Sequence, residues 1–324
     1  MHPLTPHPHI VAAAVLSTAH PHHAPPISYL QAVVLGLLQG VTELFPISSL
    51  GHTVLFPTLF GWTKLVDAQS HPESFWLAFV VMLHVGSAIG LLVYYWRDWL
   101  AIIAAWLRTL KTRRIETGNE KLAWLIIAAS IPTGILGLLL EHPVRVGLAK
   151  PMAAASFLIV NGVMLLGAET IRRRSDRHLA EHGLETTTEA ELHGARPLTS
   201  VSYKEAATVG VAQSIGLIAG MSRDGAVMSY GLLRGLSYAA AARFSFLLAT
   251  PIILAAGIFK LGDLTGPLGA GIRGQALVAA ACAAVAGFVS VAFLVRWFRT
   301  RTLWPFGAYC ALFGLSMVIY LAQR

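Results

Sequence analysis

Charged residues are scarce in this 324-residue chain. Asp, Glu, Lys and Arg make up 12% of it and hydrophobic residues 55%, whereas a soluble domain carries about 25% charged residues. This composition excludes an ordinary soluble domain and predicts an all-α integral membrane protein. The net charge of +8 does not indicate a nucleic-acid partner, because the basic residues gather in short loops between apolar runs, as topology signals do.

Cysteine is also rare, and no Lys or Arg precedes the first apolar run. Cys282 and Cys310 lie inside apolar runs without a Cys-x-x-Cys neighbour, which favours buried thiols over a disulfide or a metal site. The first run, residues 10–18, is too short to cross a bilayer that needs about 20 apolar residues. We therefore expect residues 1–27, rich in His and Pro, to form a flexible tail rather than a signal peptide, a span or a metal site.

Six later apolar runs are long enough to span a membrane. They cover residues 75–96, 122–140, 152–168, 244–261, 276–295 and 303–321. The connections on one side carry fifteen Lys and Arg residues and those on the other side carry six, which places the first set in the cytoplasm and both termini outside. The longest connection is a predicted cytoplasmic loop at 171–204. It divides a single membrane domain into a first repeat, 28–170, and a second repeat, 205–324.

Two further apolar stretches are interrupted by polar residues and resemble each other. Residues 39–52 read QGVTELFPISSLGH, and residues 213–226 read QSIGLIAGMSRDGA. At an offset of 174 residues the identical pairs are Gln39 and Gln213, Ser48 and Ser222, and Gly51 and Gly225. This match indicates an internal repeat.

A straight helix through the first stretch would place Glu43 and His52 in hydrocarbon at a cost of several kcal/mol, and Pro46 would break its hydrogen bonds. We therefore expect each stretch to form a re-entrant helical hairpin covered by protein. Three predicted spans separate the two hairpins, so the second enters from the opposite face. The sequence thus predicts an inverted-topology repeat whose two turns meet near the membrane midplane.

The two turns hold the residue types that phosphate chemistry uses. Broken helices present N–H groups and positive dipole ends, and Arg223 adds a fixed charge suited to an anion. Glu43 would repel a bare anion, so it needs a divalent cation between them or a role as proton acceptor. Ser48 or Ser49 with His52 supplies a hydroxyl and a base. Together they indicate phosphoryl transfer or hydrolysis.

Taken singly, these residues are equally typical of helix packing and capping. Only their concentration in both copies of the repeat favours a functional site. His84 lies inside a predicted span, and we assign it a packing or gating role.

The first stretch resembles the undecaprenyl-diphosphate phosphatases associated with bacitracin resistance. That family's motif, Glu/Gln-x-x-x-Glu followed by Pro-x-Ser-Ser-x-Gly-His, is matched by Gln39, Glu43, Pro46, Ser48, Ser49, Gly51 and His52. Its second motif, Pro-Gly-x-Ser-Arg-Ser-x-x-Thr, is matched in part by residues 219–227, where Ala219, Asp224 and Val227 depart from it. The resemblance extends from about residue 28 to the C-terminus.

The resemblance implies hydrolysis of undecaprenyl diphosphate to undecaprenyl phosphate and phosphate, which recycles the lipid carrier for cell-wall synthesis. It also implies a bacterial plasma-membrane location, a site open to the outer face, and Mg²⁺ or Ca²⁺ as cofactor. By position, the implied catalytic residues are Glu43, Ser49, His52 and Arg223. The implied substrate-binding residues are Ser48, Gly220, Ser222, Arg223 and Gly225. The implied metal ligands are Gln39 and Glu43, with Asp224 as a further candidate.

Other functions stay open at this point. A carboxylate at Asp224, beside Arg223, would weaken anion binding unless it binds the metal or points away, because a unit charge at ~4 Å is worth about 4 kcal/mol at an effective dielectric of 20. The same architecture suits a transporter or flippase for a lipid-linked phosphate or another anion, or a catalytically weak binding protein. The sequence also leaves open a homodimer and the choice between a covalent and a direct water mechanism.

Overall fold

The computed structural model describes residues 26–69, 74–148, 150–181, 196–259, 262 and 266–324. Nearly all of the predicted tail, 1–27, lies outside these residues. Within them the fold is all-helical, with twelve α-helices and three short 3-10 helices. The only β-type contact in the same residues is an isolated bridge between Arg196 and Leu236.

Six helices are long and apolar enough to cross a membrane, and each coincides with one of the predicted runs. They are α4 (Phe75–Tyr94), α6 (Gly118–Leu148), α7 (Pro151–Glu181), α10 (Tyr238–Phe259), α12 (Arg273–Trp297) and α13 (Trp304–Ala322). The prediction of a multi-pass helical membrane protein is confirmed.

Two polar connections contain more helix than the sequence predicted. Helix α5 (Trp96–Thr112) occupies most of the first one, and it packs on α6 through Ile102, Ala105 and Thr109, which are buried at helical spacing. Helix α7 continues past its apolar part to Glu181, and Arg173 there binds Glu169 one turn earlier at 2.7 Å. Residues 182–195 of the predicted loop lie outside the described residues.

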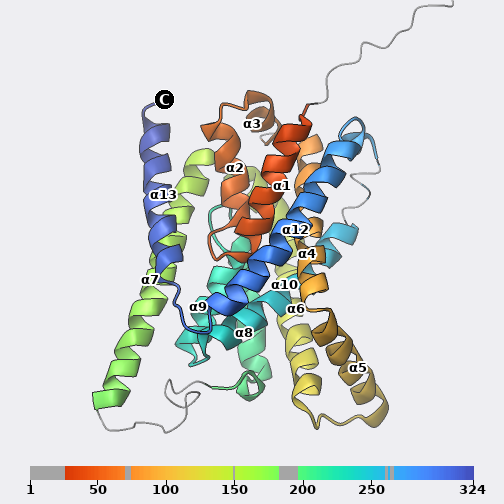
Figure 1. Ribbon diagram of the computed structural model, residues 1–324, viewed down its shortest axis with the longest axis vertical. Helices are drawn as coiled ribbons and strands as arrows, with labels where there is room; N and C mark the ends of the chain where they lie inside the picture. Colours follow the sequence, from red (N-terminus) through yellow and green to blue (C-terminus); the bar gives the residue numbers. More distant parts are fainter. Residues whose placement is uncertain (1–25, 70–73, 149, 182–195, 260–261, 263–265) are drawn as a thin grey trace, which may run out of the picture.

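The two interrupted stretches each form a pair of short helices joined by a turn. Their bounds are α1 (Tyr29–Leu44), α2 (Ser49–Leu59), α8 (Tyr203–Gln213) and α9 (Arg223–Leu233). Helices α1 and α8 begin at equivalent positions with the same capping box, built on Ser28 and on Ser202. Figure 1 shows α1 and α2 in one half of the molecule and α8 and α9 in the other.

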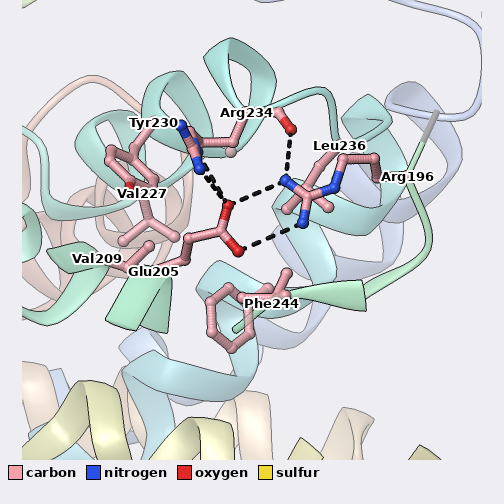
Figure 2. Close-up of a pocket in the computed structure, with 10 residues that line it drawn as sticks. Arg196, Glu205, Val209, Val227, Tyr230, Arg234, Leu236 and Phe244 are labelled. Atoms are coloured by element: carbon pink, nitrogen blue, oxygen red, sulfur yellow. Dashed lines mark hydrogen bonds and ion pairs between the residues drawn. The ribbon is translucent and has the colours of Figure 1, made fainter. Parts of the chain in front are cut away.

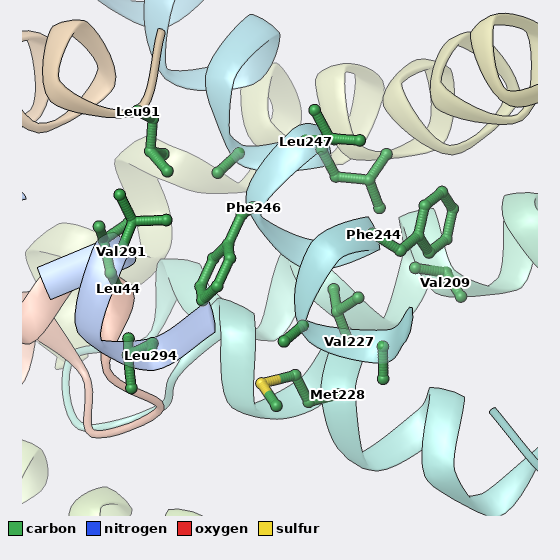
Figure 3. Close-up of a cluster of buried hydrophobic side chains, with 14 of the residues drawn as sticks. Leu44, Leu91, Val209, Val227, Met228, Phe244, Phe246, Leu247, Val291 and Leu294 are labelled. Carbon is green, nitrogen blue, oxygen red and sulfur yellow. The ribbon is translucent and has the colours of Figure 1, made fainter. Parts of the chain in front are cut away.

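Small residues let α1 and α4 approach α12 closely. A Cβ atom at Gly40 of α1 would lie 2.6 Å from that of Ala286, so only glycine fits there. Leu44, Leu91, Val291 and Leu294 lie on one side of the fully buried Phe246 in the same hydrophobic core (Figure 3). This core holds the end of α1, where the first turn begins.

Glu205 ties α8 to the end of α9 and to the segment that precedes α8 (Figure 2). Its carboxylate accepts hydrogen bonds from Arg196 at 3.0 and 3.3 Å and from Arg234 at 2.7 Å. Contacts with Arg196, the Ser202 backbone and Arg234 hold the pKa of Glu205 well below its usual range. The cavity beside these side chains measures about 10 Å³, roughly the space of a single water. The cluster is therefore a structural clamp rather than a ligand site.

Replacing Glu205 by glutamine should lower the free energy of unfolding by about 2 kcal/mol at neutral pH, because charged hydrogen bonds of this kind contribute that much. The folded-state pKa is depressed, so the carboxylate's contribution is complete above its ordinary value of 4.5 and declines as the pH falls toward the folded-state value. Thermal unfolding of wild type and E205Q should therefore differ most above pH 5 and converge in acid. E116Q, which changes an exposed carboxylate, should match wild type throughout; a constant gap down to pH 3 would contradict the assignment.

Candidate active site

The hydroxyl of Ser48 holds the first turn and joins it to the second. Ser48 has a φ of 71°, in the left-handed region that few non-glycine residues adopt. Its Oγ accepts the N–H of Gly51 at 3.2 Å, which caps α2, and the N–H of Gly220 at 3.1 Å. These two bonds support the strained backbone and place Ser48 and Gly220, both predicted as substrate-binding residues, at one junction.

Asn161 of α7 fixes both turns from the side. Its Nδ2 donates to the Pro46 carbonyl at 3.0 Å, and its Oδ1 accepts the N–H of Ser222 at 3.0 Å. Ser222 in turn caps α9 by accepting the N–H of Gly225 at 3.0 Å. Asn161 is fully buried. The two turns therefore have a defined relative position.

Close backbone packing at the junction requires glycine. Gly220 has a φ of 100°, and a Cβ atom there would lie 2.8 Å from the Cβ of Phe157 and 2.7 Å from the Leu158 nitrogen. G220A should therefore lose about 3 kcal/mol or more of stability, since an unfavourable φ and overpacking each cost about 1–3 kcal/mol. G61A is the matched control, because Gly61 also has a positive φ but nothing within 4 Å. Equal melting-temperature losses in the two variants would contradict the steric account.

Glu43 is the centre of a buried side-chain cluster. Its Oε2 accepts hydrogen bonds from Gln39 Nε2 at 3.1 Å and from the hydroxyl of Ser49, and His84 Nε2 lies 3.5 Å away. Its Oε1 accepts from Arg223 Nη2 at 3.1 Å. The carboxylate of the first turn and the guanidinium of the second thus share one site, although they lie 180 residues apart in the chain.

Arg223 retains free donor capacity in this cluster. Its Nη2 also lies 3.3 Å from Asp224 Oδ1, which accepts a bond from the Ser245 hydroxyl at 2.7 Å. Within the described part of the chain, the buried Arg223 Nη1 and Asp224 Oδ2 have no hydrogen-bond partner. Unpartnered guanidinium donors are suited to the oxygens of a phosphate.

The predicted pairing of Ser49 with His52 is replaced by a pairing of Ser49 with Glu43. His52 Nδ1 lies 2.7 Å from the Ser48 carbonyl and must carry the proton, because a carbonyl only accepts. His52 Nε2 lies 2.8 Å from the hydroxyl of Tyr309, on which the ring also stacks. Both ring nitrogens of His52 thus have partners in the structure, and the carboxylate that accepts the Ser49 hydroxyl's hydrogen bond is Glu43.

The site offers a divalent cation only a few protein ligands. Among the described residues no group of three His, Cys, Asp or Glu converges on one point. Gln39 Oε1 is buried without a hydrogen-bond partner next to Glu43, and Mg²⁺ is commonly held by one or two carboxylates, waters and substrate phosphates. Gln39 and Glu43 match that donor set, while Arg223 contacts both Glu43 and Asp224.

Four residues of the site were not assigned to it from the sequence. They are His84, Asn161, Ser245 and Tyr309. Each is a polar residue within a predicted span. Such a residue often has a functional role, but its position in the sequence does not indicate which residue it contacts. His84 was assigned to packing or gating, and the structure places it against Glu43.

Comparison with known proteins gives consistent results. A family model described as "Bacitracin resistance protein BacA" matches residues 32–316. Undecaprenyl-diphosphatase 2 of Frankia alni is 47% identical, over 91% of this chain and 98% of the relative. Undecaprenyl-diphosphatase of Mycolicibacterium paratuberculosis is 47% identical, over 92% of this chain and 99% of the relative. Undecaprenyl-diphosphatase 2 of Chromobacterium violaceum is 38% identical, over 90% of this chain and 98% of the relative. The chain belongs to the bacitracin resistance protein BacA family.

Proposed function

We propose that this protein hydrolyses undecaprenyl diphosphate to undecaprenyl phosphate and inorganic phosphate in the bacterial plasma membrane, and so recycles the lipid carrier for cell-wall synthesis. The observation that carries the proposal is the contact between Glu43 and Arg223 across the two turns, with Ser49 bonded to the same carboxylate. An acid–base group, a hydroxyl and an anion-binding fork thus lie within one buried cluster. The names of the relatives agree with this reaction.

The two helix pairs are re-entrant hairpins of an inverted-topology repeat in this proposal. Support comes from α2 and α9, whose bounds both differ by 174 residues, and from the positions of the pairs in opposite halves of the molecule (Figure 1). In such repeats helix ends meet near the midplane around an anionic group. In this proposal α1 and α2 lie toward the outer face and the site opens there, which the distribution of Lys and Arg among the loops supports.

In the proposed reaction Ser49 Oγ bonds to the terminal phosphorus while the bond from that phosphorus to the bridging oxygen breaks. Glu43 takes the Ser49 proton and returns it to the departing undecaprenyl phosphate. Glu43 then takes a proton from the water whose oxygen bonds to the phosphoserine phosphorus. The bond from Ser49 Oγ to phosphorus breaks, the proton returns from Glu43 to Ser49 Oγ, and phosphate is released. Arg223 Nη1 binds the phosphate oxygens. Gln39 and Glu43 would hold Mg²⁺ or Ca²⁺, which when bound offsets the charge of the diphosphate.

Purified protein supplied with undecaprenyl diphosphate should release inorganic phosphate in Mg²⁺ or Ca²⁺. Chelation by EDTA should lower the rate by about 100-fold or more, since a metal ion stabilises transition-state charge by several kcal/mol. Adding the cation back should restore the rate. In sealed proteoliposomes, movement of the lipid across the bilayer without phosphate release would instead support the transporter alternative.

A further inference from the structure

A second cavity lies where the end of α4 and the start of α5 meet the first turns of α10 and the last turn of α12. It measures about 430 Å³, within the range of about 300–1,000 Å³ that is typical of small-molecule sites. Its lining includes the charged side chains of Asp98, Arg243 and Arg299 and the aromatic side chains of Tyr94 and Phe298. None of its lining residues belongs to the Glu43 cluster. The cavity is therefore separate from the proposed active site.

The cavity carries surplus positive charge. Arg243 Nη2 lies 2.5 Å from Asp98 Oδ1, and both side chains are partly exposed, at 46% and 34%. Arg299 is exposed on the same cavity. Two guanidinium groups thus face one carboxylate. An added anion would complete the charge balance, and two arginine forks match the oxygens of a phosphate.

Helix α5 carries the signature of a helix at the membrane surface. Its exposed apolar residues recur every three or four positions and so form one stripe: Trp96, Leu100, Ile103, Leu107 and Leu110. Arg97, Arg108 and Lys111 are exposed beside this stripe. A stripe of this kind bordered by basic residues is typical of helices that lie among lipid head groups. Because Asp98 is in the first turn of α5, the cavity lies near the start of this helix.

We propose that this cavity binds the phosphate head group of an anionic phospholipid in the leaflet that faces the basic loops. Arg299 and Arg243 bind the phosphate oxygens, and Tyr94 and Phe298 contribute the aromatic wall. Basic pockets between membrane helices are a known form of anionic-lipid site. The apolar stripe of α5 places the start of this helix, and the cavity beside it, at the depth of the lipid head groups.

Native mass spectrometry of the purified full-length protein tests the proposal. Delipidated protein in neutral detergent is titrated with phosphatidylglycerol, phosphatidylcholine or inorganic phosphate. Wild type should prefer phosphatidylglycerol, and each of R243Q and R299Q should weaken its binding about fivefold, since one basic residue contributes about that factor. D98N should strengthen binding, because it removes the carboxylate that competes for Arg243.

R301Q is the matched control. Arg301, like Arg299, follows the end of α12, but its guanidinium lies over the Trp297 ring and it does not line the cavity. Its lipid binding should equal that of wild type. If R243Q unfolds because its ion pair with Asp98 is lost, D98N and R299Q still decide between the outcomes. Equal binding of phosphatidylglycerol by wild type, D98N and R299Q would overturn the proposal. Saturation by inorganic phosphate at the same concentration as phosphatidylglycerol would overturn the lipid assignment.

Discussion

Replacing Glu43 by glutamine should lower kcat for phosphate release by about 10³-fold, within the range of about 10²–10⁴ that a general base contributes. Glutamine is similar in shape but cannot take the proton of Ser49, whose hydroxyl is bonded to the carboxylate. It also removes the negative partner of Arg223. S49A should cause a similar loss, and E43Q/S49A little more than either alone, because residues that act as a unit are not additive.

Steady-state assays of E43Q with undecaprenyl diphosphate measure the effect, and E169Q is the matched control. Glu169 is likewise a buried carboxylate, and it accepts hydrogen bonds from Arg173 at 2.7 Å and Tyr238 at 2.9 Å, outside the site. E169Q should lose stability but keep the kcat of its folded fraction. An E43Q enzyme with near wild-type kcat would remove Glu43 from the proposed reaction.

The six spans were predictable because their signal is local. An apolar run of about 20 residues needs no partner to be recognised. The two turns were predictable for a related reason: Glu43 and Arg223 are too costly to leave in hydrocarbon, so each must have a polar partner. The sequence therefore predicted that the two turns meet, and the structure joins them through Glu43 and Arg223 and through Ser48 and Gly220.

The partners of individual atoms could not be predicted in the same way. Ser49 and His52 are close in sequence and suggested a nucleophile with its base, but the rotation of α2 directs the His52 ring to Tyr309. Tyr309 lies 257 residues further along the chain. Asn161 bridges both turns, yet within its own span it is merely one polar residue. Such pairings depend on helix rotation and packing, which the pattern of apolar residues does not fix.

Replacing Arg223 by lysine should lower kcat/KM by about 10²-fold or more, comparable to the loss of a donor that stabilises transition-state charge. Lysine keeps the positive charge but lacks the planar fork. In the structure Nη2 of Arg223 is occupied by Glu43 and Asp224, while Nη1 is buried and unpartnered within the described residues. A single ammonium group at this position would be held by the two carboxylates and would leave the phosphate without a donor.

The contrast with R234K makes the test specific. Arg234 also binds a carboxylate, at 2.7 Å, but in the Glu205 clamp. R234K should lower the melting temperature and leave kcat/KM unchanged. R223K should lower kcat/KM and leave the melting temperature unchanged, because the lysine keeps the ion pairs with Glu43 and Asp224 but lacks the Nη1 donor. R223A should have a lower kcat/KM than R223K, since the Glu43 and Asp224 carboxylates would then repel the diphosphate. If R223K hydrolysed undecaprenyl diphosphate as well as wild type, charge alone would suffice and Nη1 would not be the phosphate donor.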